Sequence, residues 1–344
     1  MKKWALSLAA LLITFSATHS LTLFSPGSPG ITFLEHVNIN IAPHPYPHPD
    51  LVFYNSLLDL PLDVRKSMNL KVAGSKTIWA NVGSSQLHLP TGPEGQKTRG
   101  PIGLRCLDLE ALSRKTGVDI VDNTVTLTSP SGQVLEVRQC REGQEEMLTW
   151  RGDMWKAKSN LLKSEDKVHG KSEEDKNLVG IDYVEMSVPV GSAGKILSFY
   201  ENIFKSKTHM VSDGVGVVAI GGVAEDGRCC QSLVFRESES VDDYDGHHVA
   251  LYIGGDMEGF RTVFDQCKSR GLVWVNERFS DKVLDWESAV KAQQFRINSI
   301  VDEEGNLLYK LEHEIRSVEH KDNRSDLWET SDVPVEQEAQ CASK

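Results

Sequence analysis

Hydrophobic and polar residues alternate along four short segments of the chain, and the pattern is similar in all four. The segments are residues 33–41 (FLEHVNINI), 101–107 (PIGLRCL), 181–188 (IDYVEMSV) and 247–253 (HHVALYI). Alternation with a period of two is typical of a β-strand with one buried face. Its recurrence predicts an architecture built from repeated units.

Segments with helical periodicity follow these strands. Asp50, Ser192 and Asp256 each stand where a helix is expected to begin, and a short helix is expected over residues 109–115. Further strands are predicted at residues 77–82, 85–89, 124–127, 134–138, 215–220, 232–236, 295–300 and 307–312. The repeating unit is therefore one strand, one helix and two or three more strands.

Parity sorts the side chains of the first strand into two faces, because successive residues of a strand point to opposite sides. One face is apolar and suited to packing beneath a helix: Val37, Ile39 and Ile41. The other face is polar: His36, Asn38 and Asn40. The same argument adds His88 and Glu136 from later strands to the polar side. We therefore expect a concave, partly polar face that carries ligand-type side chains.

Two charged stretches with few apolar residues divide the chain. Residues 141–179 are dominated by Lys, Glu, Asp and Ser, which predicts a linker. Residues 317–344 are acidic and lack periodicity, which predicts a disordered tail. Two folded blocks are expected, one on each side of the linker, at residues 31–140 and 180–316, and each contains two of the recurring strands.

The first twenty residues have the composition of a secretory signal peptide. Lys2 and Lys3 precede an apolar run over residues 4–15, and we expect cleavage after Ser20. The apolar run is shorter than the roughly 20 residues that a transmembrane helix needs. The sequence thus predicts a secreted protein with no membrane association after processing.

Six cysteines in such a protein permit disulfides, for example between Cys106 and Cys140.

The net charge limits the classes of partner. It is −12 for the whole chain and −14 once the two lysines of the predicted signal peptide are removed. An acidic surface disfavours both nucleic acid and anionic membranes. We therefore expect no nucleic-acid or membrane partner.

Several weak motifs, found in this order, resemble the vicinal oxygen chelate superfamily, which includes glyoxalase I, bleomycin-resistance proteins and extradiol dioxygenases. The motifs are LEHVNI, WANVGSSQLHLP, SPSGQVLEV, SFYENIF, GHHVALYI and DEEGNLLYKLEHE. The resemblance implies an α+β fold with two tandem domains. Each domain would consist of paired βαβββ modules that form an open curved sheet around a cavity.

The resemblance also implies a divalent metal, held at the first and last strands of the modules. His36 matches the first-strand ligand, His88 the last strand of the first module and Glu136 the last strand of the second. Pro101 departs from the pattern, since many members carry His at its position. Two histidines and a carboxylate can hold Fe(II), Mn(II), Ni(II) or Zn(II).

The second block departs further from the family pattern. Its corresponding positions hold Tyr183, His248 and, by counting from Gly305, Tyr309. Parity offers a second assignment there, in which Lys310 and Glu312 face the cavity. Because only His248 of the first set is a good ligand, we favour a structural role for it. We expect the metal site in the N-terminal block.

Two functions from different classes remain open. The first is a metal-dependent enzyme acting on a small substrate that chelates the metal through neighbouring oxygens, with lyase, isomerase and dioxygenase reactions equally compatible. The second is a non-catalytic small-molecule-binding protein of the bleomycin-resistance type, favoured by Pro101 and by the altered second block. A third interpretation makes His36, His88 and Glu136 ordinary strand residues that hydrogen-bond to their neighbours.

Overall fold

The structure is a computed structural model that describes residues 30–45, 48–63, 77–141, 144, 148, 177–223, 229–320 and 329–330. The predicted signal peptide and most of the predicted linker and tail lie outside these residues. Within the described part of the chain, no helix has the length and apolar character needed to cross a membrane.

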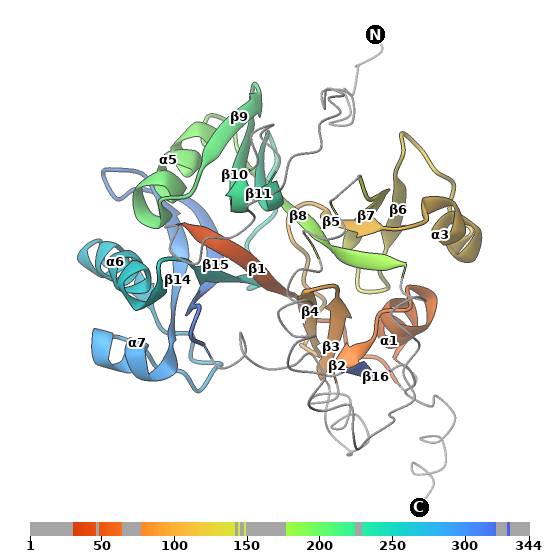
Figure 1. Ribbon diagram of the computed structural model, residues 1–344, viewed down its shortest axis with the longest axis horizontal. Helices are drawn as coiled ribbons and strands as arrows, with labels where there is room; N and C mark the ends of the chain where they lie inside the picture. The colour runs from red at the N-terminus through yellow and green to blue at the C-terminus, as the bar shows by residue number, and fades with distance from the viewer. Residues whose placement is uncertain are drawn as a thin grey trace, which may run out of the picture.

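The strand–helix–strand unit occurs four times, as the sequence predicts (Figure 1). The first module contains β1 (Ile31–Asn38), α1 (Pro49–Leu51) continued by the π-helix η2 (Val52–Leu57), β2 (Leu62–Asp63), β3 (Thr77–Val82) and β4 (Ser85–Pro90). The second contains β5 (Ile102–Cys106), α3 (Leu109–Thr116), β6 (Val125–Thr128) and β7 (Val134–Gln139). Both modules combine helices with strands, as the predicted α+β fold requires.

The two later modules are longer. The third contains β8 (Leu178–Pro189), α5 (Ala193–Phe204), β9 (Thr208–Ser212), β10 (Val215–Val223) and β11 (Cys229–Ser238). The fourth contains β12 (His248–Ile253), α6 (Asp256–Ser269), β13 (Val273–Trp274), α7 (Trp286–Ala292), β14 (Gln294–Val301) and β15 (Leu307–Ser317). A short strand, β16 (Glu329–Thr330), pairs with β2.

The modules form two open sheets, and the modules of one sequence block do not share a sheet. A nine-stranded sheet has the order β13-β14-β15-β12-β1-β4-β3-β2-β16, and a seven-stranded sheet has the order β6-β7-β5-β8-β11-β10-β9. The first module is therefore paired with the fourth, and the second with the third. Figure 1 shows red β1 beside the strands of the last module. We expected each block to build its own sheet, and the pairing instead crosses the two blocks.

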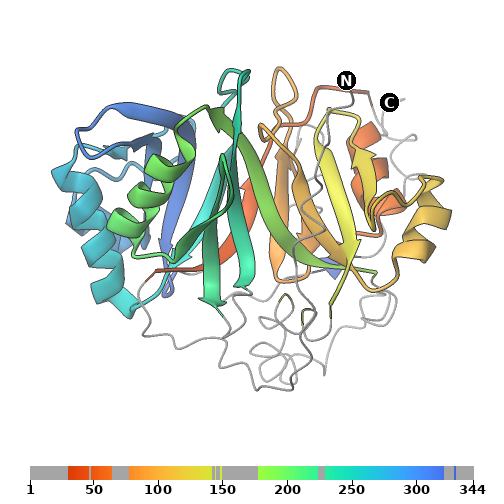
Figure 2. The same ribbon diagram turned by 90° about the horizontal axis from the view of Figure 1, so that it is seen from above.

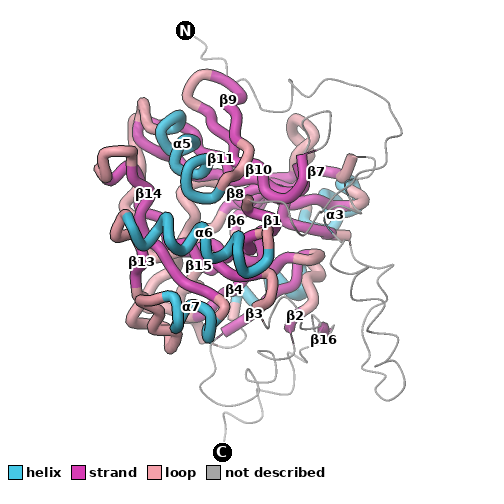
Figure 3. The backbone as a smooth tube through the Cα atoms, turned by 60° about the vertical axis from the view of Figure 1, so that its left-hand side comes forward, coloured by secondary structure: helices cyan, strands magenta, loops and turns pink. Residues whose placement is uncertain are grey.

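Helices cover the outer flanks of the two halves, and the strands lie between them (Figure 2). For example, α6 packs against β12, β13 and β15 (Figure 3). The apolar strand faces beneath the helices merge into one core that includes Val37, Leu104 and Phe295. Burying side chains of this size contributes roughly 1.5–3 kcal/mol each, so this core is the main source of stability.

A buried glutamine joins the two sheets. Gln231 of β11 accepts a hydrogen bond from the backbone N–H of Leu34 at 2.9 Å and donates to Ser85 Oγ at 3.0 Å. It also donates to the carbonyl of Ile181 in its own sheet at 3.0 Å. Because buried polar groups need partners, these bonds fix how the sheets meet.

The predicted helix starts hold with local differences. Asp50 lies within α1 rather than before it, and His48 is the N-cap. Asp50 is buried, and its carboxylate accepts a hydrogen bond from Ser131 Oγ at 2.7 Å, so a tertiary contact replaces the cap.

The described cysteines are free thiols: Cys106, Cys140, Cys229, Cys230 and Cys267. The disulfides that the composition permits are thus not formed among them.

Candidate metal centre in the nine-stranded sheet

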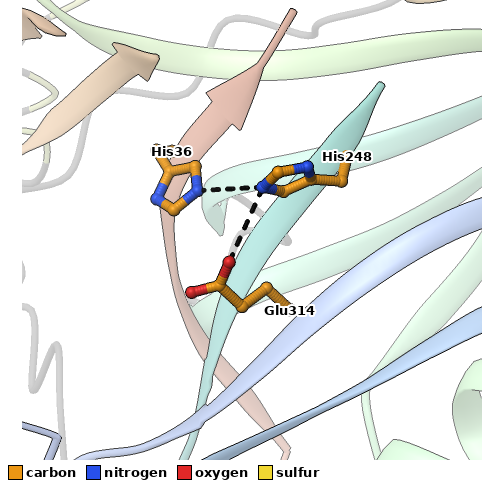
Figure 4. A group of neighbouring side chains, drawn as sticks. All are labelled: His36, His248 and Glu314. Atoms are coloured by element: carbon orange, nitrogen blue, oxygen red, sulfur yellow. Dashed lines mark hydrogen bonds and ion pairs between the residues drawn. The ribbon is translucent and has the colours of Figure 1, made fainter. Parts of the chain in front are cut away.

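Three ligand-type side chains meet on the concave face of the nine-stranded sheet. They are His36 of β1, His248 of β12 and Glu314 of β15, all buried, and one ligand atom of each lies within 4.8 Å of the others. His36 Nε2 is 3.4 Å from His248 Nε2, and His248 Nε2 is 3.6 Å from Glu314 Oε2. Figure 4 shows the three side chains pointing toward one another from neighbouring strands.

Strand register brings these residues together although they are far apart in sequence. In the antiparallel β1–β12 pair, His36 lies opposite Ala250 and Asn38 opposite His248. In the parallel β12–β15 pair, Ala250 lies beside Glu314. Directly paired residues point to the same face of a sheet. The small side chain of Ala250 therefore separates His36 from Glu314 and leaves space between them.

A β-bulge in β1 places two consecutive residues on the cluster side. Leu34 pairs with Leu251 and His36 with Ala250, so Glu35 is an extra residue between two regular pairs. Leu34 and Val37 both lie in the core. Strict alternation would direct Glu35 toward the core; the bulge turns it toward His36, and bulges commonly re-aim side chains in this way.

Glu35 fixes the tautomer of His36. Its Oε2 lies 2.7 Å from His36 Nδ1, and it also accepts a hydrogen bond from Arg316 Nη1 at 2.5 Å. A carboxylate acceptor at Nδ1 assigns the proton to that nitrogen. The lone pair is then on Nε2, which faces His248. Metal-binding histidines usually have a partner of this kind on the second nitrogen.

Two arginines keep the Glu314 carboxylate ionised. Arg296 Nη2 donates to Oε2 at 2.5 Å and Arg316 Nε donates to Oε1 at 2.6 Å. Burial alone would raise the pKa of Glu314, but these guanidiniums hold it well below its usual range. Burial also lowers the pKa of His248 well below its usual range. A neutral imidazole and an anionic carboxylate are the protonation states that a metal requires.

The charges around Glu314 do not cancel. Four carboxylates are hydrogen-bonded to Arg296 or Arg316: Glu35, Asp281, Glu312 and Glu314. With two guanidiniums, the fully ionised network has a formal charge of −2. Burial raises the pKa of Glu312 and so reduces this excess, and Asp281 is partly exposed. Negative charge that remains in the buried part favours a divalent cation, because isolated charge is costly in the protein interior.

His88 lies beside the cluster, but it is stacked on His36 instead of aimed at the shared point. Its ring centroid is 3.7 Å from that of His36 and 4.1 Å from that of Trp79. Its Nε2 lies 2.9 Å from Gln86 Oε1. Because the Gln86 amide nitrogen donates to Asp63, its oxygen must accept, so His88 Nε2 carries the proton. His88 thus supports the ring of His36.

Glu136, the third expected ligand, is in the seven-stranded sheet. Its Oε2 accepts hydrogen bonds from Tyr183 Oη at 2.5 Å and from Arg138 Nη2 at 2.7 Å. The structure therefore brings His36 and His88 together and keeps Glu136 apart from them. The physical reason is module pairing, because β7 belongs with β5 and β8 whereas β1 belongs with β12.

The sequence pattern favoured a structural role for His248 and did not single out Glu314. A usable signal was present, since His36 and His248 occupy the same place in the first and fourth copies of the recurring strand. Glu312 and Glu314 also alternate along the last strand, in line with the second parity assignment. The site consequently draws residues from both blocks, and not from the N-terminal block alone.

The donor set and spacing fit a divalent metal. Bonds of roughly 2.0–2.2 Å to nitrogen and oxygen ligands place those ligand atoms about 3–3.5 Å apart around the ion. Two of the three separations, 3.4 and 3.6 Å, are close to this range, and the third lies within 4.8 Å. Two histidines and one carboxylate with open positions is the set found in non-haem Fe(II) oxygenases, and the same ligand types bind Zn(II), Mn(II) and Ni(II).

Comparison with protein-family models gives no match, and neither does comparison with curated proteins. Solved structures do match. A protein of Bacillus subtilis described as a "putative dioxygenase" superimposes with a TM-score of 0.52 at 13% identity, over 90% of this chain and 92% of that one. Glyoxalase I from Zea mays superimposes with a TM-score of 0.46 at 12% identity, over 83% and 92%. The first of these likenesses shows a common fold.

Proposed function

We propose that this chain, which has the two-domain vicinal oxygen chelate fold, holds a divalent metal at His36, His248 and Glu314. It would act on a small molecule that chelates the metal through two neighbouring oxygens. The observation that carries the proposal is the convergence of three buried ligand-type side chains from three strands. The β-bulge at Glu35 supports the proposal, because the Glu35 carboxylate orients His36 through its Nδ1.

A metal bound here would polarise the oxygens of a chelating substrate and stabilise negative charge that develops on them. The chain's own residues have supporting tasks. Glu35 holds the tautomer of His36, and Arg296 and Arg316 hold Glu314 ionised and oriented. Among the open reactions, the two-histidine, one-carboxylate set and the likeness to the B. subtilis protein favour dioxygenase chemistry.

A second candidate is a metal-free binding protein, and one observation favours it. Arg296 and Arg316 both contact the carboxylate of Glu314, and their positive charge opposes a cation at the same place. In that case His248 Nε2–H would donate to His36 Nε2 across the 3.4 Å contact. The cluster would then be a hydrogen-bonded network in the wall of a ligand cavity.

Metal content separates the two candidates. The protein would be stripped with a chelator and offered Fe(II), Mn(II), Ni(II) or Zn(II) in turn, and bound metal would be measured by mass spectrometry. We expect one metal per chain. His248→Ala and Glu314→Gln should weaken binding by at least about 100-fold, beyond the 10–100-fold typical of residues behind the ligands.

Glu136→Gln is the matched control. It also removes a hydrogen-bonded carboxylate from a strand, but in the other sheet, so metal content should be unchanged. Metal content that is equal in the wild type, His248→Ala and Glu314→Gln would refute the proposal and favour the binding protein.

A further inference from the structure

One side chain beside the cluster has a buried oxygen without a partner. Asn38 follows His36 by two residues on β1 and points to the same face of the sheet. It lies opposite His248 on β12 and beside His88 on β4. Its side chain is 6% exposed, and within the described residues its Oδ1 has no hydrogen-bond partner.

The neighbouring polar side chains of β1 and β4 on this face are satisfied, whereas on β14 Gln294 Oε1 is a second buried acceptor without a partner among the described residues. Asn40 Oδ1 accepts a hydrogen bond from Arg278 Nη2 at 2.9 Å, and Gln86 bonds to both Asp63 and His88. A buried acceptor without a donor is disfavoured and is found in native proteins mainly where something else completes it. Asn38 shares a strand and a face with His36 and lies opposite His248, and this position indicates that a bound molecule supplies the donor.

We propose that Asn38 is a specificity-determining residue whose Oδ1 accepts a hydrogen bond from the small molecule bound at His36, His248 and Glu314. This inference rests on the proposed function and narrows its substrate class. The ligand must carry an O–H or N–H next to its two chelating oxygens, as an α-hydroxycarbonyl or a hydroxamate does. A 1,2-dicarbonyl without such a group would leave the Asn38 oxygen buried and unpaired, and sites of this kind reject such analogues.

Two hydroxamates test the assignment directly. Acetohydroxamic acid and N-methylacetohydroxamic acid both chelate through neighbouring oxygens, but only the first has an N–H. Their dissociation constants would be measured by calorimetry on the metal-loaded protein and corrected for their affinities for free metal. We expect the wild type to prefer the N–H compound about tenfold, the value of one ordinary hydrogen bond.

Asn38→Leu should abolish this preference while the metal content stays that of the wild type. Asn38→Asp keeps an acceptor of the same shape and should retain the preference. If the leucine variant does not fold, the preference is measured in Asn38→Asp instead. Using the ratio of the two compounds cancels any change in metal affinity.

The outcomes distinguish the two proposals. A wild-type protein that takes up no metal overturns both the proposed function and the role of Asn38. Metal-loaded protein that binds the two hydroxamates equally overturns only the role of Asn38. A preference that persists in Asn38→Leu also overturns it, because the N-methyl group would then be excluded by shape alone.

Discussion

At the scale of single residues, Glu35 is the main partner that orients His36. It accepts hydrogen bonds from the His36 Nδ1–H and from Arg316, so it connects the imidazole to the charged network around Glu314. Both partners are buried, and the charge-assisted bonds are therefore stronger than at the surface. His88 adds support from the ring face, and burial lowers its pKa well below the ordinary range, so His88 itself remains uncharged.

Replacing Glu35 tests this supporting role. Glu35→Gln keeps the size of the side chain but removes its charge, and we expect metal affinity to fall about 10–100-fold, as for other residues behind metal ligands. Competition with a chelator of known affinity would measure it. Glu185→Gln is the control, since Glu185 pairs with Arg236 in the other sheet. Unchanged affinity in Glu35→Gln would show that the hydrogen bond does not tune His36.

At the scale of elements, strand details decide which side chains reach each concave face. The bulge in β1 adds Glu35 to the face that carries the candidate metal site. In the seven-stranded sheet, Gly103 of β5 lies opposite Tyr183 of β8, and the tyrosine ring covers it. That close approach allows Tyr183 Oη to reach Glu136. Aromatic, apolar and paired ionic groups thus occupy the face where the other sheet has its histidines.

Adding a methyl group at Gly103 tests this packing. A Cβ at this position would lie 2.1 Å from Tyr183 Cε1, so Gly103→Ala must displace the ring. We expect the free energy of unfolding in urea to fall by about 1–3 kcal/mol, as for other overpacked sites. In Gly194→Ala the new Cβ meets nothing within 4 Å, inside α5. That control should keep or gain stability, by up to about 1 kcal/mol. Equal effects in both variants would contradict the role of Gly103.

At the scale of the whole molecule, the crossed pairing makes the two sequence blocks interdependent. β1 needs β12 from the second block, and β5 needs β8. The candidate metal site needs His36 from one block and His248 and Glu314 from the other. The core is likewise shared, and Gln231 bonds across the sheets. A block on its own would expose the edges of two half-sheets, which favours aggregation.

Separated halves should therefore not fold alone. We expect residues 1–176 and 177–344, expressed separately, to lack a cooperative unfolding transition by circular dichroism and to bind no metal. Mixed during refolding, they should recover both. The intact chain cut after folding, at a protease site inserted within residues 151–176, is the control and should keep its metal. A first half that unfolds cooperatively on its own would contradict the interdependence of the blocks.

The sequence by itself determined the local features. Period-two alternation located the strands, parity separated Val37 and Ile39 from His36 and Asn38, and the ordered motifs indicated the fold that the structure has. These features depend on neighbouring residues, and a single sequence records them directly. The residues of the predicted signal peptide lie outside the described part of the chain, so the signal peptide and the exported location remain predictions.

Tertiary structure alone decided which modules pair. All four recurring strands have similar alternation, so their pattern does not specify whether β1 adjoins β5 or β12, and that choice depends on contacts between residues about 200 positions apart. The same choice separated Glu136 from His36 and brought in His248 and Glu314. The bulge at Glu35 also required the partner strand, because an extra residue exists only relative to the strand it faces.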